Sequence, residues 1–465
     1  MVKSQHVYRL PMGFIFTAFL NFAVGAILGG VMSVNPSLAH RLAPIHAILN
    51  PYGWLTLLIY GMTFAVLALS LAVQLPSTLQ GVVQLVVAEA GVVFLVIGNA
   101  TGTSWPSHAG VVFLVLAPIL FLYNILSGVR HTKRLSRLQR ETTGSADPQG
   151  KTEASKTSNL GAALELFGRI PAYQKTDGVG QRGTDVSLML FIVAAVWIAI
   201  WNWNDASKSG LVYSPGLEWL TFYGWIGGTT LSVALHLAPR FLRRTVGPAW
   251  WWSVLQVGWF GGLVLSVIGA WRGGPWDRAG SIVIGLSLVG TAASFLWLTV
   301  LYRFARRLGG IAQTSSALQS KDTPSAAHAN DGSNFGLHGP GLVAWVVGWL
   351  SSLVLGYQLV RHGQPFALSS IHLLFLGFIT SLVYAVGYTM FPIILGRASP
   401  RRSLAYLQLA CAEIGALLLI DSFMRIEAGQ AAGPILMSGG VLATLGVLLF
   451  LAFWSLQQGN VPKAL

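Results

Sequence analysis

The chain has 465 residues, of which 54% are hydrophobic and only 9% are charged, and its mean hydropathy is +0.63. This composition excludes a disordered chain and an ordinary soluble domain, because many apolar runs of about 20 residues are each long enough to cross a bilayer. The sequence therefore predicts a polytopic membrane protein, and its formal net charge of +14 calls for no nucleic-acid partner.

The apolar runs predict an all-α fold of about 12 transmembrane helices. Each run is about as long as a membrane-spanning helix requires. In chain order the helices are expected near residues 10–33, 46–73, 79–99, 107–128, 186–203, 217–240, 249–271, 280–302, 341–360, 369–395, 403–423 and 433–456.

Lysine and arginine are distributed unevenly between the two sides of this topology. Of the 29 basic residues, 23 fall on the side shared by both termini and 6 on the other. Because cationic loops resist translocation, the sequence predicts cytoplasmic N- and C-termini in a bacterial or archaeal cytoplasmic membrane. The single cysteine, Cys411, lies inside the eleventh predicted span, which excludes a disulfide framework, a Cys-x-x-Cys-His haem attachment and a two-cysteine copper site.

Two polar segments divide the predicted helices into three groups of four. Both are rich in serine, threonine, glycine and alanine, and both fall on the predicted cytoplasmic side. The expected organisation is a four-helix unit at 1–128, a linker at 129–185, a second unit at 186–304, a linker at 305–339 and a third unit at 340–465.

The three units share landmarks in constant register. The second span of each unit contains one Gly-aromatic pair, and the three pairs are separated by 171 and 324 residues from the first: Gly53-Trp54, Gly224-Trp225 and Gly377-Phe378. The third span of each unit contains one glycine at the same offsets: Gly91, Gly262 and Gly415. Glycines are common at helix contacts in lipid, but two landmarks in one register indicate an internal repeat. We therefore expect pseudo-threefold packing with functional sites at the seams between units.

Two histidines, His46 and His372, enter membrane spans from the predicted non-cytoplasmic side, on equivalent helices of the first and third units. A polar side chain at that depth is costly unless it is paired or ligated, so both are candidates for function. The alternative for each is a hydrogen bond to a neighbouring helix. Two neutral imidazoles could instead ligate a haem iron from opposite sides, which gives a six-coordinate, low-spin centre.

The segment from His372 through Gly377 to Pro392 resembles helix ten of haem-copper oxidase subunit I, in which a histidine, a glycine and a distal proline are similarly arranged. The segment from Ile45-His46 through Gly53-Trp54 to Tyr60-Gly61 is similar to helix two of that family. The resemblance implies that His46 and His372 are the axial ligands of one low-spin haem b. It covers the whole chain, since twelve spans in three four-helix units match the family architecture.

The chain departs from that family where copper and the high-spin haem would bind. Ser370 stands at the position of the other histidine of helix ten, the sixth span begins with Glu218 and Trp219, and the seventh reads Trp-Trp-Trp-Ser at 250–253. Copper binding requires imidazole or thiolate donors, so neither copper nor a conventional oxygen reductase is expected. An enzymatic activity, if there is one, is expected to be that of another oxidoreductase.

A second resemblance is to the NnrS family, membrane proteins associated with haem, copper and nitric oxide stress. The segment from His372 to Gly396-Arg397 is similar to a histidine-led span of that family, although the fuller His-Thr-Gly-Arg ending is absent. This resemblance implies a role related to nitric oxide.

Three further residues form a candidate polar network. Glu89 and Glu413 are equivalent under the repeat and lie in mid-span, whereas the second unit has Phe260 at that position, and His108 opens the fourth span. A proton relay is one interpretation of the two glutamates, and hydrogen bonds that brace adjacent helices are the other. His108 has the alternative of a solvated histidine at the membrane surface.

The sequence thus predicts a haem-b-binding membrane protein that works in electron transfer or in the handling of nitric oxide. Its expected partners are the lipid bilayer and respiratory-chain or cytochrome subunits. Two other functions stay open: a secondary transporter, which also commonly has twelve spans and internal repeats, and a non-catalytic scaffold subunit of a respiratory complex.

Overall fold

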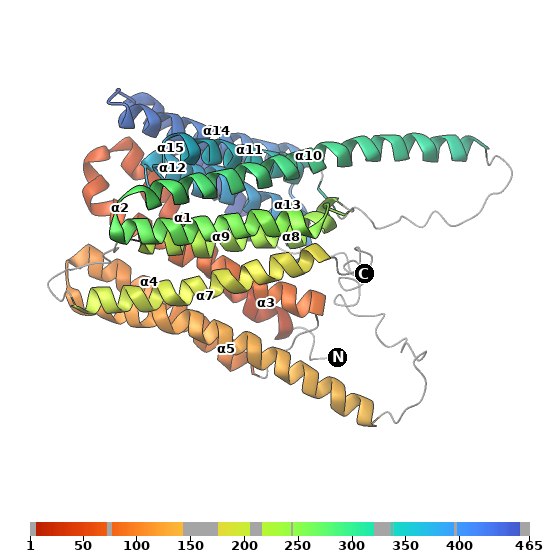
Figure 1. The fold of residues 1–465 in the computed structure, drawn as a ribbon, viewed down its shortest axis with the longest axis horizontal. Coiled ribbons are helices and arrows are strands. Elements are labelled where there is room, and N and C mark those ends of the chain that lie inside the picture. The colour runs from red at the N-terminus through yellow and green to blue at the C-terminus, as the bar shows by residue number, and fades with distance from the viewer. Residues whose placement is uncertain are drawn as a thin grey trace.

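The computed structural model describes residues 6–71, 77–142, 175–204, 216–242, 245–319, 336–337, 339–394 and 398–455. Twelve membrane-length helices run side by side in one bundle, and the described residues contain no strand (Figure 1). The predicted all-α polytopic fold is therefore confirmed.

The helices follow one another in three groups of four. The first group comprises α1 (His6–Val34), the composite second span, α4 (Thr78–Thr101) and α5 (Ser104–Thr142). The second comprises α7 (Lys175–Asn204), a composite span, α9 (Ala249–Arg272) and α10 (Pro275–Gln319). The third comprises α11 (Gly339–Arg361), a composite span, α14 (Arg402–Glu427) and α15 (Gly433–Ser455). A short turn of helix, η1 (Pro36–Leu38), precedes the composite span of the first unit.

Each composite span contains a π-helical segment next to α-helical parts. The three spans are α2 (Ala39–Ile48), η2 (Leu49–Thr56) and α3 (Leu57–Leu71) in the first unit, then η4 (Trp219–Gly227) and α8 (Gly228–Leu242), then α12 (Leu368–His372), η5 (Leu373–Thr380) and α13 (Ser381–Ile394). The last residues of η2, η4 and η5 are separated by the same offsets of 171 and 324 residues that relate the Gly-aromatic pairs. The structure thus confirms the three-unit repeat.

In two of the three π-helical segments, a threonine hydroxyl donates a hydrogen bond to the backbone carbonyl five residues earlier in the chain. Thr56 donates its hydroxyl to the carbonyl of Pro51 at 2.7 Å, and the equivalent Thr380 donates to the carbonyl of Phe375 at 2.6 Å. The Thr56 oxygen also accepts a hydrogen bond of 2.9 Å from the indole nitrogen of Trp225. This bond joins the first and second units at the centre of the bundle.

Eleven of the helices are long and apolar enough to cross a membrane, and the twelfth, at 217–242, falls short of that hydropathy. It carries Glu218, His236 and Arg240, yet almost all of its residues are buried inside the bundle. A helix that is enclosed by other helices needs no apolar face toward lipid, so its lower hydropathy is no obstacle to its position.

Three helices extend beyond their predicted limits. α5, α7 and α10 reach into the polar stretches assigned to linkers, because a hydropathy pattern ends where the apolar residues end, whereas the helical backbone continues. α5, with 39 residues, is about 58 Å long, against a hydrocarbon core of about 30 Å. Residues 143–174 and 320–335, which are about half of the two predicted linkers, lie outside the described residues.

Aromatic rings fill the seams between the units. Trp225 stacks on Phe191 at 4.7 Å between ring centroids and lies 6.2 Å from Tyr60 at the seam of the first and second units. At the seam of the second and third units, Trp219 packs against Phe366 at 5.0 Å. All of these rings except Phe366 are almost fully buried, and they provide much of the packing that holds the three units together.

Candidate functional site

His46 lies near the end of α2 and is held against α1. Its Nδ1 donates a hydrogen bond of 2.8 Å to the carbonyl of Gly25. One turn farther along α1, a Cβ added at Gly29 would lie 3.1 Å from Cε1 of the imidazole, so glycine at this position makes room for the ring. The side chain of Asn50 donates to the carbonyl of His46 at 2.8 Å, where α2 passes into the π-helix.

His372 is the last residue of α12 and lies next to the start of η5. Its Nδ1 donates a hydrogen bond of 2.7 Å to the carbonyl of Leu368, one turn back. The ring packs against Phe423 of α14 with 4.3 Å between ring centroids. These two contacts together fix the plane of the imidazole.

The tautomer of both histidines follows from their partners. A backbone carbonyl can only accept a hydrogen bond, so Nδ1 carries the proton in each ring and Nε2 keeps its lone pair. Histidines that bind metals in proteins use this arrangement, in which one ring nitrogen donates to a carbonyl and the other ligates the ion. Each side chain is therefore prepared for coordination through Nε2.

The two imidazoles lie close enough to interact electrostatically, although they come from different units. Both side chains are half-buried. The helices that carry them, α2 and α12, lie at the same end of the bundle, on the left of Figure 1. Each histidine offers one nitrogen donor of the kind that can ligate a haem iron.

Polar contacts fix the start of α12. The backbone nitrogen and the hydroxyl of Ser369 donate to the two carboxylate oxygens of Glu427 at 2.9 and 2.6 Å, at the end of α14. Ser370 is buried and donates its hydroxyl to Gln358 of α11 at 3.4 Å. The serine at the position of the other helix-ten histidine thus has a structural partner, and α12 is anchored to two neighbouring helices.

The members of the predicted polar network have separate partners. Asn21 of α1 donates to Glu89 at 2.9 Å and to the carbonyl of Gly53 at 3.2 Å. Ser381, the first residue after η5, lies 2.9 Å from both carboxylate oxygens of Glu413. His108 lies 5.6 Å from the ring of Trp203. The hydrogen bonds of the two glutamates brace α4 and α14 against the neighbouring spans.

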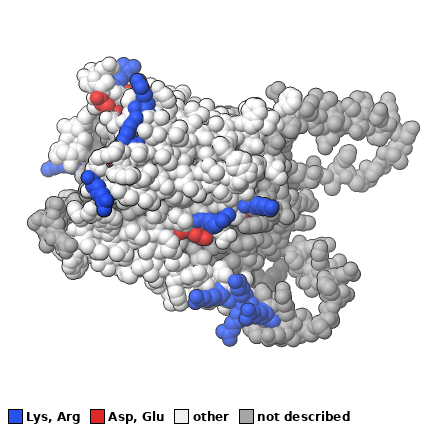
Figure 2. Space-filling model, viewed as in Figure 1, with Lys and Arg blue, Asp and Glu red and all other residues white. Residues whose placement is uncertain are grey.

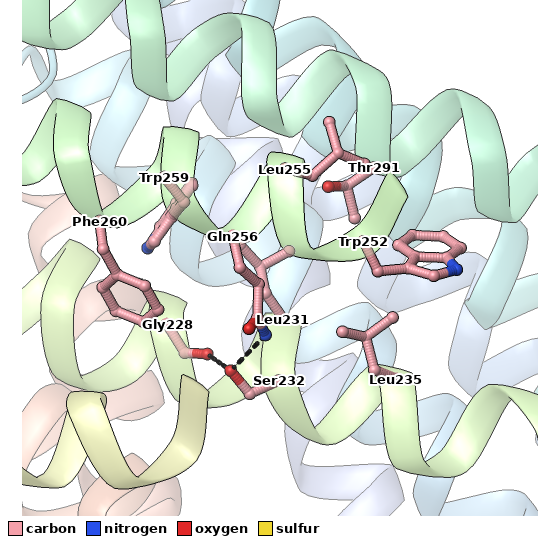
Figure 3. Close-up of a pocket in the computed structure, with 10 residues that line it drawn as sticks. All are labelled: Gly228, Leu231, Ser232, Leu235, Trp252, Leu255, Gln256, Trp259, Phe260 and Thr291. Atoms are coloured by element: carbon pink, nitrogen blue, oxygen red, sulfur yellow. Dashed lines mark hydrogen bonds between the residues drawn. The ribbon is translucent and has the colours of Figure 1, made fainter. Parts of the chain in front are cut away.

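The second unit replaces the Glu–Ser pair of the third unit with Phe260 and Gly228 (Figure 3). Beside them is a cavity of about 10 Å³, the size of a single water molecule, which lies between α8, α9 and α10. Gln256 donates to Ser232 at 3.1 Å next to it, and Ser232 donates to the carbonyl of Gly228 at 2.7 Å. This space is too small for an organic ligand.

An ion pair that the sequence patterns did not predict lies at the opposite end of the bundle. Asp177 of α7 is buried and accepts a hydrogen bond of 2.7 Å from Arg240 and one of 3.1 Å from His236, both on α8. Asp177 falls inside the segment predicted as a linker, so hydropathy gave no reason to place it among the helices. The available signal was the spacing of His236 and Arg240, which are four residues apart and therefore share a helix face.

Trp250, Trp251 and Trp252 lie in the first turn of α9. Trp252 donates its indole nitrogen to the carbonyl of Val246 and stacks on Phe295 at 4.7 Å. These contacts place 250–253 beside the turn between α8 and α9, at the end of α8 remote from Trp219. In the described parts of the chain, no group of three or more His, Cys, Asp or Glu side chains is arranged to hold a metal ion.

Comparisons with known proteins show a similarity of fold and do not assign the chain to a family. No protein-family model matches the chain, and no curated protein matches it. Among solved structures, the chain is similar to a haem-copper terminal oxidase dimer determined by cryo-EM, with a TM-score of 0.60 and 13% sequence identity over 97% of this chain and 84% of the other. The predicted fold of the haem-copper oxidase type is thus confirmed, and at this identity the similarity extends to the fold alone.

Proposed function

We propose that the protein binds one haem b between His46 and His372 and transfers electrons through it within the membrane. The observation that carries the proposal is the matched hydrogen bonding of the two imidazoles, since each donates Nδ1–H to a backbone carbonyl and keeps Nε2 free. The fold supports it, because the solved structure that the chain resembles is that of a haem-copper terminal oxidase.

The residues determine which chemistry fits. A haem supplies an iron that alternates between the ferric and ferrous states by taking up and releasing one electron. The carbonyls of Gly25 and Leu368 orient the imidazoles and make them more basic ligands. If His46 and His372 both held the iron of a haem, they would leave no position for oxygen or nitric oxide, which favours electron transfer over catalysis on a diatomic substrate. The donor and acceptor are expected to be respiratory-chain or cytochrome subunits.

The test is a reduced-minus-oxidised absorption spectrum, with a pyridine haemochrome assay, on purified wild type and on His46→Ala and His372→Ala. We expect a low-spin b-type spectrum in the wild type that is lost in both variants. His40→Ala is the matched control, because His40 also has its Nδ1 bonded to a carbonyl, that of Ser37 at 2.8 Å, but is exposed to solvent. It should keep the spectrum.

Two results would contradict the proposal. If the wild-type protein stays colourless after expression with ample haem, haem binding is excluded, and a scaffold or transport role becomes the leading hypothesis. A haem spectrum that persists unchanged in both His46→Ala and His372→Ala would retain the cofactor and place its ligands elsewhere.

A further inference from the structure

One face of α5 is exposed along the length of the membrane span. Five large side chains on it are between 41% and 55% accessible, and they recur at alternating steps of four and three residues: Val112, Leu116, Ile119, Tyr123 and Leu126. That spacing keeps side chains on one stripe of an α-helix. Because no other described helix covers these residues, the stripe faces the acyl chains of the bilayer.

The same stripe becomes cationic where the helix leaves the apolar span. The steps of four and three continue from Leu126 to Arg130, Lys133 and Arg137, and Arg134 lies beside them on the same side. All four basic side chains are exposed. Figure 2 shows a group of basic side chains on this part of α5, separated by a nearly uncharged belt from the charges at the other end of the molecule. We call these four residues the basic stripe.

The basic stripe is not neutralised within the described part of the chain. The ion pairs between described residues join Asp177 to Arg240 and His236, and Asp421 to Arg425. None of the four cations of the stripe takes part in them. The preference of membrane proteins for basic residues on one side accounts for their number but not for their alignment with the lipid-facing row.

We propose that the basic stripe binds the headgroups of anionic phospholipids. At a rise of about 1.5 Å per residue, Arg130 lies about 6 Å and Arg137 about 16 Å beyond Leu126 along the helix. The stripe therefore begins in the headgroup layer, which is about 5–7 Å deep, and ends about 9 Å beyond it. Arginine and lysine both bind phosphate, and their long side chains can reach back toward the membrane surface. The exposed apolar side chains of α5 would contact the acyl chains of a phospholipid, and the basic stripe that continues them would contact its phosphate group. This order is the one found across a single phospholipid layer.

A soluble acidic protein is the other partner that such charges could attract. Such a protein could bind the basic stripe wherever it lay on the helix surface. A phospholipid instead contacts the exposed apolar side chains of α5 and the basic stripe at the same time. The alignment therefore favours the lipid, and binding of pure lipids in the absence of any other protein distinguishes the two.

The test is to titrate the purified full-length protein in detergent with short-chain phosphatidylglycerol or phosphatidylcholine and to count bound lipids by native mass spectrometry. The wild type should prefer phosphatidylglycerol. Lys133→Gln combined with Arg137→Gln should weaken that binding by about tenfold to thirtyfold. Arg401→Gln combined with Arg402→Gln is the matched control, because it removes the same charge from two exposed arginines at the start of α14. It should leave the affinity close to that of the wild type.

Lys133→Arg combined with Arg137→Lys keeps the charge and should keep the binding, which separates an effect of charge from damage to the helix. Equal binding of the two lipids by the wild type would overturn the proposal, and so would equal losses in the stripe variant and the Arg401/Arg402 control. These measurements do not depend on haem, so their result is independent of the proposed function.

Discussion

The ring of Phe260 lies against Gly228, at the two positions where the third unit pairs Glu413 with Ser381. A Cβ at Gly228 would come within 3.1 Å of the ring and within 2.5 Å of the Ser187 hydroxyl, so this glycine is required by the close approach of its neighbours. The third unit has a hydrogen-bonded pair at these positions, whereas the second unit has an apolar contact. Because Gly228 has no side chain, α8 and α9 can still lie in contact there.

Gly228→Ala should destabilise the protein, because the added methyl group overpacks this contact, at a cost of about 1–3 kcal/mol. The matched control is Gly261→Ala on the same helix as Phe260, where an added Cβ meets nothing within 4 Å. Thermal unfolding in one detergent should give a lower midpoint for Gly228→Ala than for Gly261→Ala. Equal midpoints would mean that the neighbouring side chains move aside without cost.

The hydrogen bond from Trp225 to Thr56 should contribute measurably to the packing of the first unit on the second. Thr56→Val removes the bond to Pro51 and also leaves the buried indole N–H without an acceptor, whereas Thr380→Val removes only the equivalent bond to Phe375. We expect Thr56→Val to be less stable than Thr380→Val by about 1–3 kcal/mol, the cost of an unsatisfied buried donor. The comparison of their unfolding midpoints tests this, and a reversed order would contradict it.

The stability of the protein should depend on the ion pair between Asp177 and Arg240. Arg240→Gln removes the 2.7 Å partner of a carboxylate that is 2% exposed, while His236 stays beside it. We expect a loss of stability of about 3 kcal/mol, at the low end for a broken buried pair, because Arg240 itself is 23% exposed. Arg182→Gln is the control, since that exposed arginine donates a hydrogen bond to the carbonyl of Gly178 on its own helix. Unfolding midpoints of the two variants in one detergent check this. A comparable loss of stability in both would show that charge alone, and not the buried pair, is responsible.

The proposed axial ligation predicts a change of reduction potential. In His372→Met the thioether sulfur would replace one imidazole, and a histidine–methionine pair gives a higher potential than two histidines. Redox titration followed by absorbance should therefore show a more positive midpoint than in the wild type. Phe423→Leu, which alters only the ring that packs on His372, should retain the haem with a smaller change. A midpoint that does not move in His372→Met would argue against ligation by this residue.

Sequence patterns predicted the helices, their order and the threefold repeat, because hydropathy and the spacing of glycines report directly on burial in lipid and on close helix contacts. They did not predict the π-helical segments. A π-helix is defined by which carbonyl each amide bonds to, and neither Gly53-Trp54 nor its two equivalents carries a signal of that choice in its composition. They also ended α5 and α10 too early, since a polar helix outside the membrane has no apolar run to mark it.

His46 and His372 were selected from the sequence by their depth in the membrane, but their hydrogen-bond partners were not predictable. Gly25 lies in a different span from His46, and only the packing of α2 on α1 brings its carbonyl within 2.8 Å. Asn21 reaches Glu89 in the same way, across 68 residues of sequence. Contacts of this kind depend on how the helices are rotated about their axes, which a single sequence leaves open.

The three π-helical segments also report on the internal symmetry of the chain. A π-helix is rare and appears mostly as a single turn inside an α-helix. Three segments that end at Thr56, Gly227 and Thr380, in one register, therefore mark the same place in three copies of one four-helix unit. His46 and His372 do not share that register, because the position equivalent to 46 in the third unit is Ser370, so the proposed ligand pair departs from the symmetry that the π-helical segments follow.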